Sequence, residues 1–167
     1  MNADELRALQ TPIKQAYRST PDSALVTSRI EVSLEPASLA VRLVPDRPSV
    51  AGLHPATGGT GAAACSADML LEALAACAGV TLLAVATATG VAVTGGRIVA
   101  EGVWDARGTL AVDKTVPVGI QRITLRFELD SSADQAARER LVRTAERYCV
   151  ILATLRGTTP IEVQISP

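Results

Sequence analysis

One long apolar stretch organises this chain, at residues 65–90: CSADMLLEALAACAGVTLLAVATATG. Ser66 is suited to cap the start of a helix, Asp68 places negative charge in its first turn, and Gly90 is suited to end it. The interval between these signals is about 23 residues, or about 35 Å of α-helix. The sequence therefore predicts one long helix with Cys77 near its middle.

This predicted helix is apolar on nearly every side, since only Asp68 and Glu72 carry charge. Such a helix is either buried all round or spans a membrane. The two acidic residues shorten the apolar run, and no basic cluster flanks it as one flanks many membrane-spanning helices. We therefore expect a buried central helix, covered by a sheet or by a partner subunit, and no membrane association.

Bulk composition favours one cytoplasmic domain over residues 1–167. With 16 basic and 17 acidic residues and 2% aromatics, the chain lacks the charge and the stacking rings of a nucleic-acid-binding surface. Its 3 cysteines form no CxxC pair, and its single histidine cannot build a His-based zinc site, so we expect no metal and no cofactor. Asp4 and Glu5 are atypical of a signal peptide, which favours a reducing compartment.

The first 22 residues predict a helical extension to the domain. Residues 3–18 have apolar residues at helical spacing, and Pro12 is expected to kink or split that helix. A turn is expected at residues 20–22.

The next segment predicts two strands and a loop. Residues 24–34 alternate between apolar and polar side chains, which is typical of a strand with one solvated face. Residues 39–44 alternate likewise, and residues 35–38 are suited to close a hairpin between them. Residues 45–61 are rich in Pro and Gly and predict a loop.

Further elements follow the central helix. They are a strand over 91–104 with a break at Gly95-Gly96, a turn over 105–108, a strand over 120–129, a helix over 133–148 capped by Ser131 or Ser132, and a final strand over 161–165. This order predicts an α+β fold with a curved antiparallel sheet packed on the central helix.

Two features of the loop look chemical but have simpler interpretations. His54 is the only histidine, and we expect an exposed loop residue. Residues 57–61, TGGTG, precede a helix but lack the lysine and the glycine spacing of a phosphate-binding loop, so a turn is expected.

The cysteine pattern alone leaves two interpretations of Cys77 open. It is either a small buried apolar residue or a reactive thiolate, which needs a nearby cation or donor and a second thiol within reach. Cys149, at the end of the helix over 133–148, is a candidate for that second thiol. Cys65 lies about 18 Å from Cys77 if the intervening chain is helical, which is too far for a disulfide, and is expected to be a buried small residue.

Two segments resemble the OsmC/Ohr family. Residues 68–77, DMLLEALAAC, resemble the family's first-cysteine helix, and residues 146–151, ERYCVI, resemble the segment of its second cysteine. The resemblance covers about residues 24–165. The N-terminal helix and the stretches AGLHPATGG and ACSADMLLEALAACAGVTL are similar to an OsmC-like subgroup rather than to Ohr itself.

The resemblance implies an intertwined homodimer whose curved antiparallel sheets wrap around two long central helices. It also implies a thiol peroxidase acting on organic hydroperoxides. The resemblance implies that Cys77 attacks the peroxide and becomes a sulfenic acid. It further implies that Cys149 resolves this sulfenic acid as an intramolecular disulfide, and that an external dithiol restores both thiols.

One position departs from the family pattern. The family has an acidic residue ten positions before the first cysteine, paired with an arginine that activates the thiolate. Here that position is Ala67, and the neighbouring acid, Asp68, falls on the helix face opposite Cys77. Asp68 is still a candidate for the acid, across a dimer interface or from an irregular first turn, and Arg18 and Arg29 are both candidates for the arginine.

Two functional hypotheses follow. The first is a hydroperoxide reductase that uses Cys77 and Cys149. The second is an OsmC-fold binding protein that holds an apolar ligand at the dimer interface without turnover. Contact between the two sulfurs and a cation beside Cys77 would favour the enzyme.

Overall fold

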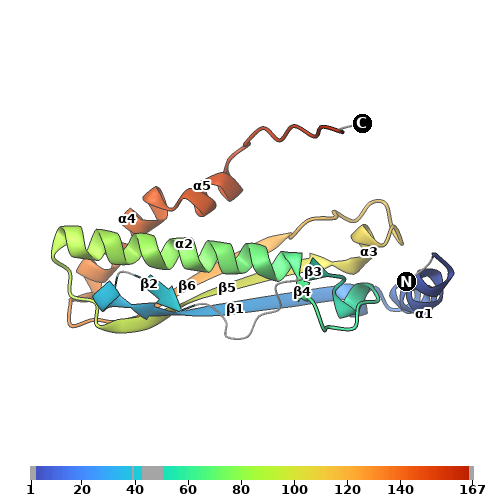
Figure 1. Cartoon of the computed structure of the whole chain (residues 1–167), viewed down its shortest axis with the longest axis horizontal. Coiled ribbons are helices and arrows are strands. Elements are labelled where there is room, and N and C mark those ends of the chain that lie inside the picture. The colour runs from blue at the N-terminus through green and yellow to red at the C-terminus, as the bar shows by residue number, and fades with distance from the viewer. Residues whose placement is uncertain (1–2, 39, 43–50, 166–167) are drawn as a thin grey trace.

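The computed structural model describes residues 3–38, 40–42 and 51–165, and its architecture is α+β as predicted (Figure 1). A four-stranded antiparallel sheet, in the order β2-β1-β5-β6, lies along one side of the long helix α2. The bounds are α2 Ser66–Thr89, β1 Leu25–Glu35, β2 Ala40–Arg42, β5 Gly95–Asp105 and β6 Arg122–Asp130.

Helix α2 is the centre of the main core. Its buried side chains pack across β1 and β5 and against the C-terminal helices. By length and composition α2 is apolar enough to cross a membrane, but here it packs as a core helix. It ends at Gly90 as predicted, with φ of 70° and a backbone N–H that donates to the carbonyls of Ala86 and Thr87. The predicted cap is wrong by one residue: Cys65 holds the N-cap position, and Ser66 is already helical.

The two faces of the sheet differ in character. Ile30, Val32 and Leu34 of β1 are buried in the core with α2, because side chains alternate along a strand. The other face carries arginines and glutamates in ion pairs, among them Arg97 with Glu31 at 3.2 Å. Strands β1 and β5 stay in antiparallel register over their length, from Leu25 opposite Asp105 to Ser33 opposite Arg97.

The hairpin between β1 and β2 is confirmed, with a 3₁₀ turn over Pro36–Ser38. Residues 39, 43 and 44 of the predicted strand lie outside the described residues. The predicted loop over 45–61 is more ordered than expected where it is described. It contains the short strand β3 (Ala51–Gly52) and the 3₁₀ turn η3 (Pro55–Thr57), and β3 pairs in parallel with β4 (Ala64–Cys65).

Helix α1 (Ala3–Ser19) is followed by the 3₁₀ turn η1 (Pro21–Ala24). Pro12 does not split α1. Pro12 has no N–H to donate to the carbonyl of Ala8, but both residues are exposed, so water is available to that carbonyl. Tyr17 of α1 joins a second, smaller core with Trp104, Ala106 and Leu110 at the end of the sheet (Figure 1).

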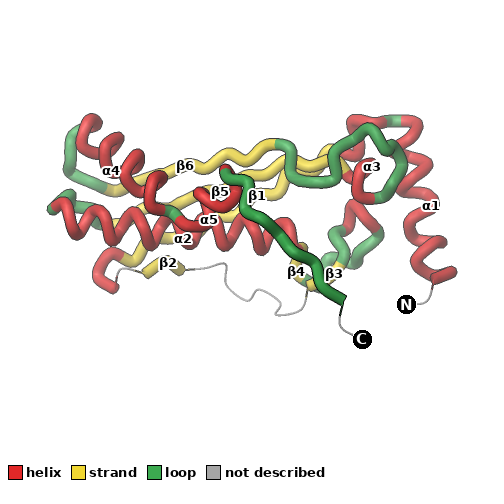
Figure 2. The backbone as a smooth tube through the Cα atoms, turned by 90° about the horizontal axis from the view of Figure 1, so that it is seen from above, coloured by secondary structure: helices red, strands yellow, loops and turns green. Residues whose placement is uncertain are grey.

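Three helices follow β5. Helix α3 (Ala106–Thr109) is a single turn, α4 spans Gln135–Tyr148, and α5 spans Val150–Arg156. Asp134, rather than Ser131 or Ser132, caps α4 by accepting the N–H of Ala137 at 2.7 Å. The hydroxyl of Ser131 instead donates to the carbonyl of Ala92. Figure 2 shows α4 running beside α2 over the sheet. The sequence pattern does not predict α5 as a helix.

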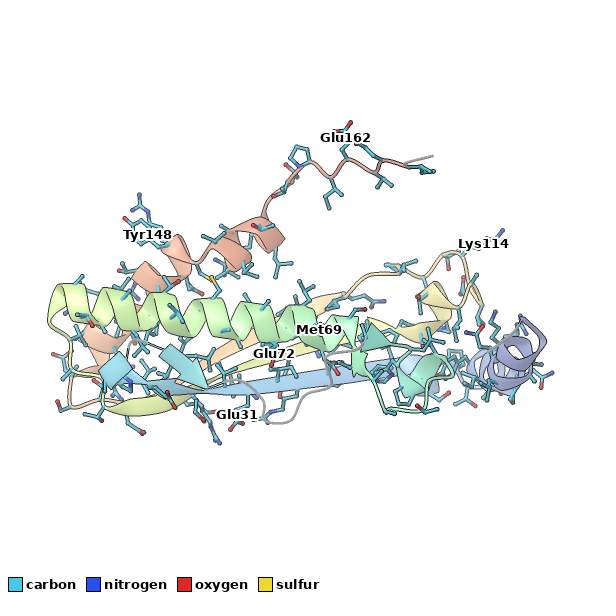
Figure 3. All side chains as sticks on the ribbon, in the orientation of Figure 1. Glu31, Met69, Glu72, Lys114, Tyr148 and Glu162 are labelled. Atoms are coloured by element: carbon cyan, nitrogen blue, oxygen red, sulfur yellow. The ribbon has the colours of Figure 1, made fainter. Side chains whose placement is uncertain are left out.

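The predicted strand over 161–165 does not form within one chain. The segment is extended and stands away from the rest of the molecule, where Figure 3 labels Glu162 (Figures 1 and 3). Ile161, Val163 and Ile165 are 87%, 86% and 94% exposed. A strand forms only against a neighbouring strand, and none of the described chain lies beside this segment.

The predicted break at Gly95-Gly96 is the start of β5. The φ of Gly96 is +126°, and a Cβ there would lie 2.2 Å from the carbonyl oxygen of Glu128 on β6. Only glycine fits this position without moving the strand pair.

Gly96→Ala is therefore expected to lower the free energy of unfolding by at least about 2 kcal/mol, measured by urea denaturation. Gly119→Ala is the matched control, since a Cβ there meets no atom within 4 Å. It should change stability by less than about 0.5 kcal/mol. Equal midpoints for the two variants would contradict the described geometry of β5.

Candidate active site

The structure brings Cys77 and Cys149 together. Cys77 lies half-buried at the middle of α2, and Cys149 is fully buried at the junction where α4 ends and α5 begins. Their thiols lie close enough for each to shift the pKa of the other, and neither is in a disulfide. Packing of the α4–α5 pair on α2 therefore places the second thiol beside the first.

Backbone N–H groups also point at the Cys77 sulfur. Helix α5 starts at Val150, and the first N–H groups of any helix have no partner within it. The N–H groups of Val150 and Ile151 lie near the Cys77 sulfur and lower its pKa, and the hydroxyl of Thr81, one turn along α2, has the same effect. Four donors thus favour ionisation of Cys77 when the thiol of Cys149 is included.

These contacts shift the pKa values of the two thiols in opposite directions. Burial raises the pKa of the Cys77 thiol, but the hydrogen bonds from Ile151, Cys149, Val150 and Thr81 outweigh it and hold the pKa below its usual value. Burial also raises the pKa of the Cys149 thiol, and the hydrogen bond and negative charge at Cys77 raise it further. Cys77 is therefore the thiol of the pair that ionises more readily, and Cys149 is the one that holds its proton to higher pH.

The two candidate arginines lie elsewhere within the chain. Arg29 is on the solvent face of the sheet, opposite α2, where it pairs with Glu31 at 2.9 Å and with Glu101 at 3.4 Å. Arg18 is in the last turn of α1, beyond the start of α2 (Figure 1). Neither contributes to the pKa of Cys77. The sequence analysis did not predict the α5 N–H donors. The apolar run after Cys149 was the only feature there that could indicate them.

Asp68 and Cys65 are also apart from the cysteine pair. Asp68 shares a face of α2 with the buried residues Leu71 and Ala75, and its buried Oδ1 atom has no hydrogen-bond partner among the described residues. Cys65 is half-buried at the start of α2, where it lines a pocket together with Ala67. Among the residues that the structure describes, no three His, Cys, Asp or Glu side chains gather as metal ligands.

Comparisons with known proteins agree with this architecture. A solved structure of an OsmC-like hydroperoxide resistance protein from Jannaschia sp. CCS1 superimposes with a TM-score of 0.62 over 86% of this chain and 95% of that chain. The two sequences are 17% identical, so this likeness concerns the fold.

The sequence itself places the chain in a family. The family model of the OsmC-like protein matches residues 59–164, well over half of the chain and a range that includes both Cys77 and Cys149. The chain belongs to the OsmC-like family, as the resemblance of its cysteine segments predicted. A search of curated proteins gave no match.

The hydroxyl of Thr81 offers a direct test of the thiolate. Thr81→Val removes one donor to the Cys77 sulfur, so the pKa of Cys77 should rise and less thiolate should exist at pH 7. We expect alkylation of Cys77 by iodoacetamide at pH 7 to slow roughly threefold, with the rate-against-pH curve displaced to higher pH.

Thr89→Val is the matched control, because the hydroxyl of Thr89 donates only to carbonyls at the end of α2. It should leave the curve in place. Peptide mass spectrometry separates Cys77 from the other cysteines. A Thr81→Val curve that coincides with wild type would contradict the assigned donor.

Proposed function

We propose that this protein is a thiol-dependent peroxidase that reduces organic hydroperoxides through Cys77 and Cys149. The observation that carries the proposal is the contact between a Cys77 thiol of lowered pKa and a Cys149 thiol of raised pKa. Membership of the OsmC-like family and the hydroperoxide resistance named for the Jannaschia protein support a peroxidase-type function.

The first step is an attack on the peroxide. The Cys77 thiolate displaces the alkoxide from ROOH, so the O–O bond breaks, an S–O bond forms, and Cys77 becomes a sulfenic acid. The alkoxide takes a proton and leaves as ROH. The sulfur is oxidised by two electrons and the peroxide is reduced by two.

The second step uses the neighbouring thiol. The sulfur of Cys149 attacks the sulfenic sulfur, its proton leaves with the hydroxyl as water, and a Cys77–Cys149 disulfide forms. An external dithiol then exchanges with this disulfide and restores both thiols. The buried location of Cys149 suits a resolving thiol that must stay protonated until Cys77 has reacted.

The surroundings of Cys77 favour an apolar substrate. The sulfur lies against the main hydrophobic core, to which α2 and the α4–α5 pair contribute their aliphatic side chains. An alkyl or aryl hydroperoxide buries its organic group against such a surface, and hydrogen peroxide does not. A cytoplasmic location, where dithiol reductants are available, suits the cycle.

A homodimer is part of this proposal. Met69 and Val80 leave apolar surface on α2, at 40% and 43% exposure, and the C-terminal segment leaves more. A second copy whose curved sheets wrap the two α2 helices would cover this surface. In one chain the α5 N–H groups take the place of Arg18, Arg29 and Asp68 as activators of Cys77.

The alternative is an OsmC-fold binding protein that holds an apolar ligand at the dimer interface. The exposed apolar surface of α2 and the absence of an arginine beside Cys77 within the described chain favour it. This alternative requires no Cys77-dependent turnover.

Consumption of cumene hydroperoxide with dithiothreitol as reductant distinguishes the two. Wild type should turn over, and Cys77→Ser should fall to the rate of free dithiothreitol, because a serine hydroxyl is not ionised at neutral pH. In a separate reaction without dithiothreitol, prereduced Cys149→Ser should reduce one equivalent of peroxide and accumulate a Cys77 sulfenic acid, detected by dimedone labelling.

Cys65→Ser is the control and should keep the wild-type rate, since Cys65 lies outside the pair. Hydrogen peroxide should be consumed more slowly than cumene hydroperoxide. If Cys77→Ser retained full peroxide consumption, the peroxidase assignment would be wrong.

A further inference from the structure

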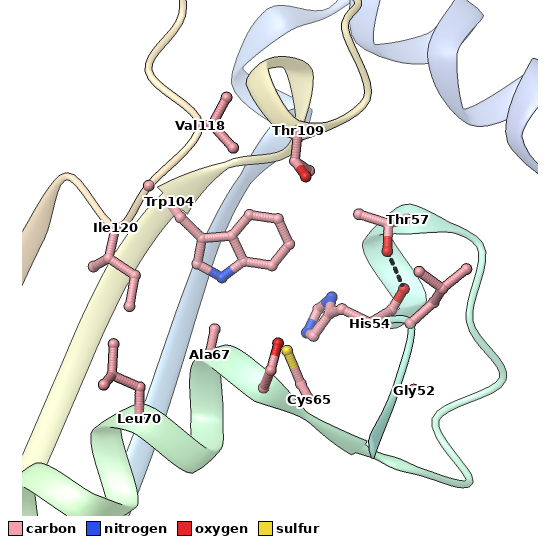
Figure 4. Close-up of a pocket in the computed structure, with 13 residues that line it drawn as sticks. Gly52, His54, Thr57, Cys65, Ala67, Leu70, Trp104, Thr109, Val118 and Ile120 are labelled. Atoms are coloured by element: carbon pink, nitrogen blue, oxygen red, sulfur yellow. Dashed lines mark hydrogen bonds between the residues drawn. The ribbon is translucent and has the colours of Figure 1, made fainter. Parts of the chain in front are cut away.

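A pocket lies at the start of α2, away from Cys77. It has a volume of about 430 Å³, within the range of small-molecule sites (Figure 4). Apolar side chains contribute most of its wall, among them Leu53, Leu70 and Ile120, and polar groups come from His54, Cys65 and Trp104. The residues that bound it come from the segment before α2, from the first turns of α2, and from β5 and the chain after it.

Trp104 gives this pocket an unsatisfied donor. The side chain is only 6% exposed, and its indole Nε1 has no hydrogen-bond partner in the described part of the chain. Figure 4 shows the nitrogen edge of the indole turned toward the start of α2, where Ala67 and Cys65 lie. Most buried donors in proteins are paired, and an unpaired one costs about 1–3 kcal/mol. The indole N–H is thus a buried donor without an acceptor in the described part of the chain.

His54 supplies a second donor beside the first. Its Nδ1 accepts the backbone N–H of Ala56 at 3.0 Å, so the neutral imidazole carries its proton on Nε2. The imidazole meets the Trp104 ring edge to face, with centroids 5.2 Å apart. His54 was expected to be an exposed loop residue, but it is half-buried and packed in this wall.

Helix α1 fixes the segment that carries His54. The hydroxyl of Tyr17 donates to the carbonyl of Ala56 at 2.9 Å, and the side-chain amide of Gln10 donates to the carbonyl of Thr57 at 3.1 Å. The N-terminal extension therefore holds this wall of the pocket in place. A pocket built in advance loses less ordering entropy when a ligand binds.

The charges around the pocket indicate which kind of hydrogen-bond acceptor a ligand can bring into it. Among the residues that the structure describes, the pocket lining includes no lysine, arginine, aspartate or glutamate, and Asp68 lies in the first turn of the adjacent helix. An anion would enter without a cation to pair with, and near a like charge. An uncharged oxygen has no such cost. We propose that this pocket binds an uncharged apolar molecule through a carbonyl oxygen, which accepts from Trp104 Nε1 and His54 Nε2.

Ligand binding can be followed at the Trp104 indole directly, because Trp104 is the only tryptophan in the chain. In a ¹H–¹⁵N correlation spectrum of the full-length protein the indole N–H gives one resolved peak. Titration with 2-octanone should move this peak downfield and saturate, as expected for a new hydrogen bond to the indole. Sodium octanoate, with a similar chain and a negative charge, should bind at least tenfold more weakly.

Two results would overturn the proposal. One is an indole peak that does not respond saturably up to the solubility limit of 2-octanone. The other is tighter binding of octanoate than of the ketone, which would make the site an anion site.

A variant pair tests the hydrogen bond itself. Trp104→Phe keeps an aromatic ring but loses the N–H, and should weaken 2-octanone binding about tenfold. Binding is measured here by protection of Cys65 from iodoacetamide in a Cys77→Ser/Cys149→Ser background, where Cys65 is the only thiol. Tyr148→Phe, at a side chain 60% exposed on α4, is the control and should leave the affinity unchanged. Equal affinity in Trp104→Phe and wild type would show that the indole N–H is not the donor.

One variant distinguishes failure of this proposal from failure of the proposed peroxidase function. Cys77→Ser alone should abolish peroxide turnover and leave the 2-octanone titration of the indole peak unchanged. Loss of the titration in that variant would mean that the pocket depends on the Cys77 site.

Discussion

A helix that is apolar on every side must be covered on every side, and this requirement shapes the whole chain. The sheet covers one side of α2 through the inward-facing residues of β1 and β5. The α4–α5 pair covers another, and Leu141, Ala145, Cys149 and Leu152 are its buried contributions. The apolar surface that remains on α2 is the basis for the proposed second copy.

The same packing produces the site. Because α5 begins where the chain turns at Cys149, its first N–H groups face the surface of α2 at Cys77. The proposed activation of the thiolate thus comes from backbone donors and a neighbouring thiol rather than from a guanidinium. Such donors are fixed by the fold and do not depend on an acid at the position of Ala67. Desolvation opposes them, so the pKa of Cys77 reflects a balance between burial and hydrogen bonding.

Much of this could be predicted from sequence, and the exceptions have physical reasons. The end of α2 at Gly90, the β1–β2 hairpin and the family follow from local signals. Pro12 was expected to kink or split α1, but α1 continues through it, at an exposed position where water is available to the carbonyl of Ala8. The strand expected over 161–165 has the right alternation, yet strand formation needs a neighbour that a single chain does not supply. Contact between Cys77 and Cys149 depends on tertiary packing of α4 and α5 on α2, which no spacing rule encodes. The donors of Val150 and Ile151 are backbone atoms, which side-chain patterns do not reveal.

The central claim is that Cys77 and Cys149 act as a redox pair, and its most direct measurement is the state of the three cysteines after one equivalent of cumene hydroperoxide. The reduced protein is oxidised, quenched with iodoacetamide and mapped by peptide mass spectrometry. Our account predicts a Cys77–Cys149 disulfide within one chain, with Cys65 alkylated. Alkylation of all three cysteines, or a disulfide that includes Cys65, would contradict it.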